Sequence, residues 1–417
     1  MRTALVRAAT IILAGLLIGA CSDEHRDFLA PHAGAEKLVV INRCSELILC
    51  QPNWVDISAG SGVTCAVHSL PIFLNFQLTT SNLECWGSNY YGMLGVGSTT
   101  ETCPGTYMAG GWPVSCSTVP RPVAGTRAFN SVSVGVTHVC AVEHGTGSVF
   151  CWGFNGNGQL GFGTQGVQYF TTPTSPVAGF TFSSVSAGNG ETCGLTTAQD
   201  IVCWGGNFGV NPAIASDGAT KFKALSLLGA SNMSTYCGLT TAGTSCTGSS
   251  TAFDMIGQAT TAHHTCQISA GAVQCWGDNG AGQLGVASSV RKSASSSSPV
   301  QVPGTFSFVS TGELHSCAIS GSDAFCWGDD NAGELGDQTQ GTKAVPTKVL
   351  APFGVTLSFT KISTGAEHTC AIASNAIWCW GRNESGQLGM GTTSTFLTYP
   401  TFAPVIGTSY PVKASGT

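Results

Sequence analysis

Short alternating hydrophobic segments, separated by glycine-rich turns, run through most of the chain. The clearest copy begins at Phe359, closes a first alternating stretch in Ser363-Thr364-Gly365, and continues into His368-Thr369-Cys370-Ala371-Ile372. A third stretch ends in Cys379-Trp380-Gly381 and leads into Gly386-Gln387-Leu388-Gly389. Period-two alternation over five or six residues is typical of β-strands with one buried face. The pattern therefore predicts consecutive short antiparallel strands.

This pattern occurs seven times. The second cysteine of each copy marks the repeat, at Cys85, Cys151, Cys203, Cys246, Cys275, Cys326 and Cys379, which gives a mean period of about 49 residues. Several short strands and glycine-rich turns in a period near 50 are typical of a propeller with one blade per repeat. We therefore predict an all-β fold, a seven-bladed β-propeller with four-stranded antiparallel blades.

Two copies are irregular. The third loses the Gly-Gln-Leu-Gly tail after Gly209, and the fourth, from about Phe222 to Gly248, has Thr247 where the others have tryptophan. An insertion at about residues 96–120 and a serine-rich segment, Ser293 to Ser298, are expected to be surface loops. Because a propeller ring must close, strands at residues 38–41 and 410–416 are expected to meet in or beside one blade.

The cysteines pair locally. A two-residue turn at Ser374-Asn375 pairs residue 373 with 376 and, counting outward, Cys370 with Cys379. That pair is a non-hydrogen-bonded one, whose Cα atoms lie about 4.5 Å apart, which a disulfide tolerates. Similar local spacings give nine predicted bridges within hairpins and loops: Cys44–Cys50, Cys65–Cys85, Cys103–Cys116, Cys140–Cys151, Cys193–Cys203, Cys237–Cys246, Cys266–Cys275, Cys317–Cys326 and Cys370–Cys379.

Zinc binding is the competing explanation of these cysteines. The chain has no Cys-x-x-Cys, and one hairpin supplies two ligands where zinc takes four. Of the nineteen cysteines, eighteen pair in these nine bridges, and such a set of disulfides indicates an oxidising compartment.

The N-terminus predicts export. Arg2 and Arg7 precede an apolar run from Ile11 to Ala20, which suits a signal peptide and is too short for a membrane span. The run ends Leu17-Ile18-Gly19-Ala20-Cys21, which resembles the lipobox of bacterial lipoproteins and implies a lipid on Cys21. An ordinary cleaved signal is the alternative, but it would leave Cys21 as an odd thiol. We predict a signal peptide at 1–20, a lipidated N-terminus and tether at 21–37, and the propeller at 38–417. Ser22 favours the outer membrane or the cell surface.

The charge composition excludes one class of binding partner, nucleic acids. Charged residues make up 9% of the chain and the formal net charge is −6. A chain without a basic excess lacks the electrostatic footprint that nucleic-acid binding requires. We expect no nucleic acid, and contact with the membrane through the N-terminal lipid only.

Three recurrent polar or aromatic positions could carry chemistry. Each is better explained by the scaffold: the histidines by hydrogen bonds to the next loop, the asparagines by turns, and the tryptophans by packing between blades. A metal ring, ligand binding and sugar stacking are the respective alternatives. The positions are His138, His264, His315 and His368; Asn89, Asn155, Asn207, Asn279 and Asn383; and Trp86, Trp152, Trp204, Trp276, Trp327 and Trp380.

One acidic cluster, Asp329, Asp330, Asn331 and Glu334, could bind calcium through oxygen ligands. Because Asp330 and Glu334 occupy the asparagine and glutamine positions of the repeat, a solvated turn is the preferred explanation. The chain has no Gly-x-Ser-x-Gly, His-Glu-x-x-His or phosphate-binding loop. We expect no catalytic residues, no metal and no cofactor.

From about Trp54 onward, the chain resembles the regulator of chromosome condensation repeat family. The resemblance is strongest in residues 132–138, 309–315 and 362–368, each ending in histidine, and in Trp-Gly-x-Asn-x-x-Gly-Gln-Leu-Gly. It implies a seven-bladed β-propeller. Founders of the family are nuclear guanine nucleotide exchange factors, an activity that an exported chain would have no GTPase to act on. Cysteine-paired copies are similar to secreted bacterial members.

We therefore expect a non-enzymatic, lipid-anchored, monomeric interaction module. Its variable loops, above all Glu101 to Val119 and the serine-rich segment, would contact an extracellular or envelope protein, or a glycan. Two alternatives stay open: a propeller enzyme, such as a lyase, with a site in the central channel, and a carbohydrate-binding propeller. An exposed aromatic patch on one face would favour binding over catalysis, histidines with carboxylates at the channel mouth would favour an enzyme, and repeated aromatics in equivalent exposed loops would favour carbohydrate binding.

Overall fold

A computed structural model describes residues 53–69, 81–104, 113–166, 168–173, 177–216, 220–228, 235–240, 244–246, 255–256, 264–287, 295–394 and 403–406. The predicted leader, Cys21, the tether, the Cys44–Cys50 bridge and the closing strands at 38–41 and 410–416 lie outside these residues. Within them, no helix has the length and apolar character needed to span a membrane.

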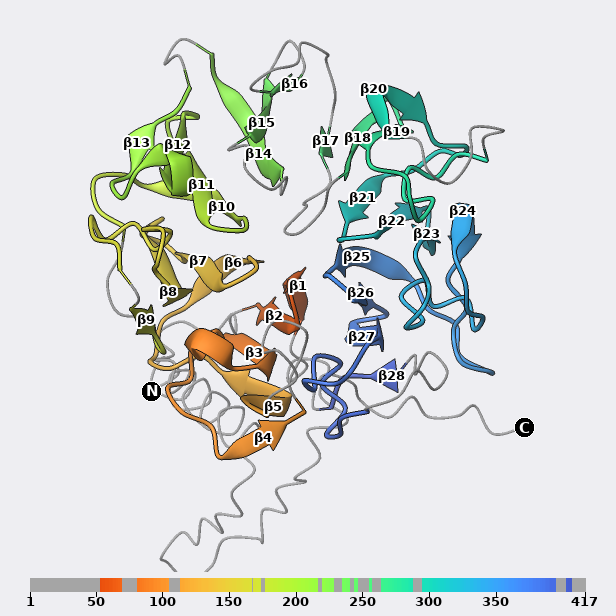
Figure 1. The fold of residues 1–417 in the computed structure, drawn as a ribbon, viewed down its shortest axis with the longest axis horizontal. Coiled ribbons are helices and arrows are strands. Elements are labelled where there is room, and N and C mark those ends of the chain that lie inside the picture. Colours follow the sequence, from red (N-terminus) through yellow and green to blue (C-terminus); the bar gives the residue numbers. More distant parts are fainter. Residues whose placement is uncertain are drawn as a thin grey trace, which may run out of the picture. The chain divides into compact units, whose positions relative to one another are not determined.

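Strands dominate the described residues and form antiparallel sheets in chain order (Figure 1). The first sheet has the order β1 (Trp54–Ala59), β2 (Val63–His68), β3 (Leu83–Ser88), β5 (Val114–Pro122), β4 (Glu101–Cys103). The second contains β6 (Phe129–Val134), β7 (His138–Glu143), β8 (Val149–Phe154) and β9 (Tyr169–Phe170). The third contains β10 (Phe182–Ala187), β11 (Glu191–Thr196), β12 (Ile201–Gly205) and β13 (Ala213–Ile214).

The fourth sheet contains β14 (Phe222–Leu228), β15 (Thr235–Thr240) and β16 (Thr244–Cys246). The fifth contains β17 (Met255–Ile256), β18 (His264–Ser269), β19 (Ala272–Gly277) and β20 (Ser296–Gln301). The sixth contains β21 (Phe308–Thr311), β22 (His315–Ser320), β23 (Asp323–Gly328) and β24 (Lys343–Lys348), and the seventh β25 (Phe359–Thr364), β26 (His368–Ala373), β27 (Ala376–Gly381) and β28 (Ala403–Pro404). Two 3₁₀ turns, η3 (Tyr90–Gly92) and η5 (Gly206–Phe208), follow β3 and β12.

Each sheet packs against the next, which is the arrangement of a β-propeller (Figure 1). The last sheet also contacts the first: the Ala366 N–H donates to the Gly60 carbonyl at 3.1 Å, and the Ala59 N–H donates to Ser363 Oγ at 2.9 Å. The prediction of seven blades of four strands is wrong in its detail. Six sheets are full blades of four or five strands, and the sheet β14–β16 has three strands among the described residues.

The central hairpin of each sheet has the register that its turn dictates. In the seventh sheet Ala373 pairs with Ala376 and Cys370 with Cys379, as predicted from a turn at Ser374-Asn375. Both turn residues have positive φ, 48° and 66°, which a two-residue type I′ hairpin requires. Cys370 and Cys379 are bonded, with Cα atoms 4.1 Å apart.

Seven cysteine pairs are bonded in the described residues, and all seven are among the predicted pairs. They are Cys65–Cys85, Cys103–Cys116, Cys140–Cys151, Cys193–Cys203, Cys266–Cys275, Cys317–Cys326 and Cys370–Cys379. The backbones of Cys237 and Cys246 are partners in the register of the fourth sheet, and their side chains lie outside the described part.

The tryptophan and the tail of the repeat fasten neighbouring sheets together. In five of the six tryptophans of the repeat, the indole Nε1–H donates to the carbonyl of the residue at the glutamine position of the preceding repeat, as Trp204 does to Gln159 at 2.8 Å. The last glycine of the same tail lies against that indole: a Cβ on Gly161 would stand 3.0 Å from Trp204 Nε1. Equivalent bonds at 2.7–2.9 Å join Trp86 to Gln387, Trp152 to Met93, Trp327 to Gln283 and Trp380 to Glu334. We call this contact the tryptophan clasp.

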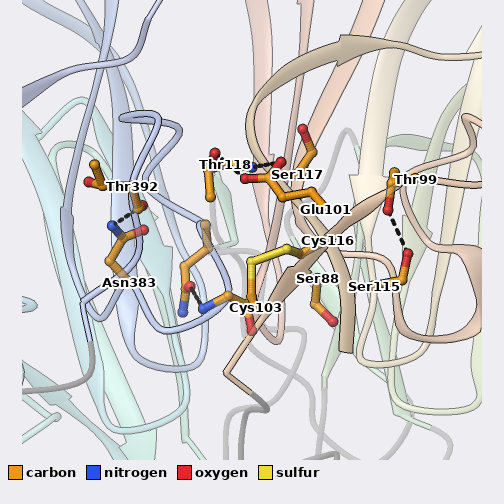
Figure 2. The surroundings of a disulfide bond; sticks show 12 residues. Ser88, Thr99, Glu101, Cys103, Ser115, Cys116, Ser117, Thr118, Asn383 and Thr392 are labelled. Carbon is orange, nitrogen blue, oxygen red and sulfur yellow. Dashed lines mark hydrogen bonds between the residues drawn. A yellow bond between two sulfur atoms is a disulfide. The ribbon is translucent and has the colours of Figure 1, made fainter. Parts of the chain in front are cut away.

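The two segments expected to be loops contain strands. The described part of the insertion forms β4 and the start of β5, which extend the first sheet, and Glu101 accepts hydrogen bonds from the Thr118 N–H and hydroxyl (Figure 2). Cys103 and Cys116 are buried beneath it. The serine-rich segment contributes the edge strand β20. Both segments were predicted as loops because their sequences show no alternation of apolar residues. An edge strand needs no such alternation when neither of its faces packs in the core.

Candidate functional site

The recurrent histidines are part of the scaffold. Each Nε2 lies 2.7–2.9 Å from a hydroxyl of the next sheet: His138 from Thr192, His264 from Ser316, His315 from Thr369 and His368 from Thr64. The same hydroxyls donate to the clasp carbonyl, as Thr192 does to Gln159 at 2.8 Å. Since that donation uses the hydroxyl's one hydrogen, the imidazole must donate from Nε2. The histidines therefore fasten the sheets.

Burial keeps these imidazoles neutral. It lowers the pKa of His138, His315 and His368 to about 3. Where histidine is absent, its hydroxyl partner can be absent as well: Val63 of the first sheet faces the second sheet, which carries Val139 at the hydroxyl position, and both belong to one apolar cluster. Each of the four histidines is buried and holds a hydroxyl of the next sheet through Nε2, which is a structural role.

Four of the five recurrent asparagines, Asn89, Asn155, Asn279 and Asn383, shape the loop after the third strand of their sheets, and Asn207 lies in the η5 turn. Asn155 Oδ1 accepts the Leu160 N–H at 3.1 Å, and its Nδ2 donates to the Thr164 carbonyl at 3.0 Å. Asn383 makes the same two bonds, to Leu388 at 3.1 Å and to Thr392 at 2.8 Å. These side chains are consumed by their own turn, as the sequence predicted.

The acidic cluster is the same turn with carboxyls in place of amides. Asp330 is fully buried; its Oδ1 accepts the Leu335 N–H at 3.0 Å, while Oδ2 has no hydrogen-bond partner. Glu334, also buried, accepts the Ala332 N–H at 2.8 Å, as a glutamine does elsewhere. Burial raises the pKa of Asp330 to about 7 and that of Glu334 to about 8. Across the described residues, no group of three metal-ligating side chains comes together.

On one face of the propeller lie the loops that enter and leave the central hairpin of each sheet, which consists of its second and third strands. We define the loop face as the turns between the first and second strands together with the loops after the third strands. Backbone bonds hold the two sets together, as from Ser88 N–H to Gly62 carbonyl and from Phe154 N–H to Thr137 carbonyl, both at 2.9 Å. Loops fixed by a rigid sheet in this way are where propellers and barrels carry binding residues.

Four aromatic side chains meet on the loop face where the first two sheets adjoin. The ring of Tyr91 lies between Tyr90, at 4.3 Å between centroids, and Phe154, at 4.7 Å. Tyr169, on the edge strand β9, lies 6.5 Å from Tyr91 and has 59% of its surface exposed. Tyr90 is 37% exposed. We call Tyr90, Tyr91, Phe154 and Tyr169 the aromatic patch.

The backbone of the patch departs from the repeat at Tyr91. Its φ is 62°, a left-handed conformation that a bulky residue adopts only at a cost of about 1–3 kcal/mol. In the second repeat the equivalent Asn157 N–H is accepted by Gln159 Oε1 at 2.9 Å. The first repeat has Met93 at that glutamine position, whose side chain is a poor acceptor. The η3 turn is therefore free to take another conformation.

Sequence profiles place the chain in a known family. The profile of the Regulator of chromosome condensation (RCC1) repeat matches residues 85–142, 146–195, 323–372 and 374–416, and a second profile of this repeat matches 359–387. The chain belongs to the RCC1 repeat family. The stretch between residues 195 and 323, which this profile does not match, holds the irregular fourth copy of the sequence pattern and the fifth copy.

Curated relatives and solved structures agree with this assignment. The ultraviolet-B receptor UVR8 of Arabidopsis thaliana is 25% identical over 356 residues, which are 82% of this chain and 70% of the receptor. The human probable E3 ubiquitin-protein ligase HERC4 is 37% identical over 84 residues, which are 20% of this chain and 8% of the ligase. The structure of Prp20p from Saccharomyces cerevisiae superimposes with a TM-score of 0.60 at 18% identity, covering 85% of this chain and 86% of that one. This structural likeness shows the fold.

Sequence reasoning missed the aromatic patch. Its members come from two RCC1 repeats and lie up to 79 residues apart, so no local motif contains them. One signal was present: Tyr90, Tyr91 and Met93 occupy positions that hold Gly156, Asn157 and Gln159 in the second repeat. A loop residue that differs from its counterparts in the other repeats is one that the fold does not require, and it is therefore a candidate for a functional role.

Replacing Asp330 with asparagine should remove a pH dependence from the sixth RCC1 repeat. Because its folded pKa is raised, the folded protein retains a proton that the unfolded chain has released; stability is full below about pH 4 and falls as the pH rises through about 7. Asp329 and Asp337 add to the shift, and Lys343 opposes it. Asp330→Asn restores the amide of the other repeats and should gain about 1 kcal/mol at pH 9 and little at pH 5.

Thermal unfolding of both proteins at the two pH values measures this difference. Asp323→Asn, on an exposed hairpin turn, is the matched control. An equal gain for Asp330→Asn at pH 5 and pH 9 would contradict a protonated carboxyl.

Proposed function

We propose that this chain is an exported, lipid-anchored RCC1-repeat propeller that binds another protein through its loop face and catalyses no reaction. The exposed aromatic patch carries the proposal. Monomeric soluble proteins seldom leave such clusters exposed, and tyrosines in the centre of an interface supply much of its binding energy. The repeat's own histidines, asparagines and tryptophans are occupied by fastening the sheets and shaping the turns.

The family supports a binding role. The structure of Prp20p is described together with its binding to Gsp1p and histones, and the same yeast protein has been solved bound to Kap60. Transfer of a protein-binding role from fold alone is an analogy, and here the aromatic patch gives it a location. We further infer that the three-stranded sheet β14–β16 is the reduced fourth blade of a seven-bladed ring, since it lies between the third and fifth sheets in the order of contacts.

Anchoring follows from the N-terminal sequence. Cys21, after the apolar run, would take the lipid, and residues 22–37 would tether the propeller at the outer membrane or cell surface. Labelling with a radioactive fatty acid in an exporting bacterial host should mark the wild-type chain and spare Cys21→Ser. Equal labelling of the two chains would overturn the anchor and leave the binding role in place.

Substitution of the patch should abolish partner binding and leave the fold intact. The full chain, the double variant Tyr90→Ser/Tyr169→Ser and the control Phe353→Ser are immobilised and exposed to envelope and culture-fluid proteins of the host. Phe353 is fully exposed in the connection between β24 and β25 and belongs to no aromatic cluster in the described structure. Wild type and control should retain one stoichiometric protein, and the double variant should retain at most about one tenth as much.

Two results would overturn the proposal. One is equal retention by the double variant at an unchanged melting temperature. The other is turnover of a substrate by the wild-type chain without any stoichiometric partner.

A further inference from the structure

We propose that the partner presents lysine or arginine side chains to the loop face, and that the aromatic patch binds their cationic groups and aliphatic stems. This inference rests on the proposed function and specifies the chemistry of the partner. Three observations support it: the charge of the face, the tilt of the aromatic rings and the conformation of Tyr91.

The loop face is acidic. Among its described residues, the half-buried or exposed carboxyls are Glu191, Asp278, Glu313, Asp329, Glu367 and Glu384. The described basic side chains of the face are two, and both are engaged: Arg382 bonds Glu367 and Glu384 at 2.5–2.9 Å, and Lys343 lies 3.5 Å from Asp337. Glu191 begins β11 of the third sheet and Glu384 follows β27 of the seventh, and these two sheets adjoin the two that carry the patch.

The opposite end of the strands is balanced in charge. There Arg127 pairs with Glu143 at 2.8 Å, Lys221 with Asp200 at 2.6 Å and Lys348 with Asp323 at 2.7 Å. Among the described residues, the excess of carboxyls over basic side chains therefore lies on the loop face. Complementary charge steers a basic partner to this side of the propeller and speeds association.

The aromatic rings do not form a flat platform. Tyr91 is tilted by 54° from Tyr90, 35° from Phe154 and 54° from Tyr169. Tyr91 contacts the three other rings, whereas Tyr90 and Tyr169 are the exposed members, so ligand contact falls mainly to Tyr90 and Tyr169. Separate tilted faces suit a cation or a methylene stem, which needs one ring within about 6 Å, better than a sugar ring that stacks on a flat surface.

The left-handed backbone of Tyr91 lowers the stability of the fold, and the chain keeps this residue nevertheless. Restoring the repeat's residues, Tyr91→Asn with Met93→Gln, would return the hydrogen bond that Gln159 makes to Asn157 and relieve the left-handed tyrosine. A strained aromatic residue that buttresses exposed neighbours is typical of binding sites. This loop therefore places the Tyr91 ring against Tyr90 and Tyr169 at a cost in stability.

The test uses a random peptide library displayed on phage, selected against the full chain in detergent. Selected peptides should be enriched in lysine and arginine. A synthetic representative should bind the wild-type chain and the Phe353→Ser control equally, and Tyr90→Ser/Tyr169→Ser about 30-fold more weakly. Asp278→Lys and added salt should weaken it several-fold.

A variant that restores the residues of the repeat separates a loss of binding from a loss of stability. Tyr91→Asn/Met93→Gln should melt at the same or a higher temperature than the wild type and still lose most of the peptide binding. Peptide binding that survives this change at full strength overturns the role given to Tyr91.

The outcomes separate the two proposals. Peptides that need the tyrosines but carry no excess of lysine or arginine overturn the basic partner and leave protein binding in place. Peptides that bind the tyrosine variant as well as the wild type overturn both. Tyrosine-dependent binding on a glycan array, without selected peptides, replaces the protein partner with a carbohydrate.

Discussion

Replacing Asp56 with alanine is expected to lower the free energy of unfolding by about 3–5 kcal/mol. Asp56 is 7% exposed and joins three sheets: Oδ1 accepts from the Ile57 N–H at 2.9 Å and from Lys361 Nζ of the seventh sheet, and Oδ2 accepts the Val132 N–H of the second at 2.9 Å. Alanine leaves a half-buried ammonium and two backbone donors without their acceptor. The lost bonds join the first sheet to the seventh and to the second, so their loss weakens the closure of the ring.

Urea denaturation of the wild type and of Asp56→Ala measures this difference. Asp323→Ala is the matched control, because the Asp323–Lys348 pair is about half exposed and such pairs contribute about 0–1 kcal/mol. Asp56→Asn, which keeps one acceptor, should fall between the two. A loss below about 1 kcal/mol for Asp56→Ala would mean that the ion pair does not hold the ring closed.

Reduction of the disulfides is expected to have the second large effect. Six bridges close the central hairpins at Cα separations of 4.0–4.1 Å, and the seventh closes the insertion. A ten-residue loop contributes about 2.7 kcal/mol in the chain-entropy estimate, and the separate contributions do not add fully. Protein refolded with its thiols reduced should melt at least about 10 °C below the oxidised protein.

The design must allow for burial of the sulfurs. All fourteen bonded cysteines of the described residues are at most 1% exposed, so reductant has to act on the denatured chain before refolding. The control is Cys103→Ser/Cys116→Ser, which removes the bridge outside the repeat and should lower the melting temperature by a few degrees. Equal melting with and without reduction, together with free thiols in the untreated protein, would contradict a disulfide framework.

What the sequence predicted well is what short-range chemistry determines. The register of the hairpin at Ser374-Asn375 follows from turn length alone, and the burial of Trp380 follows from alternation on a strand with Cys379. What it did not predict depends on sites far apart in the chain. Tyr91 meets Phe154 and Tyr169 only because two repeats stand side by side.

Edge strands form a second class of failure. β20 and β4 were expected to be loops because one side of an edge strand carries no partner and therefore leaves no periodic apolar signature. The prediction of four strands for every sheet failed at β14–β16 for a related reason: the repeat supplies a pattern for the central hairpin, and the outer strand varies from copy to copy.

The tryptophan clasp has two halves, and the chain lacks both at one boundary. The third repeat has no Gly-Gln-Leu-Gly tail to accept the bond, and the fourth has no tryptophan to donate it. The fourth also lacks that tail, and Trp276 of the fifth repeat is only partly buried, whereas five other clasp tryptophans are fully buried. Local opening follows the least fastened segment of a fold. Amide protons of β14 and β15 should therefore exchange with deuterium faster than those of β7 or β26. The fourth repeat would then be the site at which the propeller opens first.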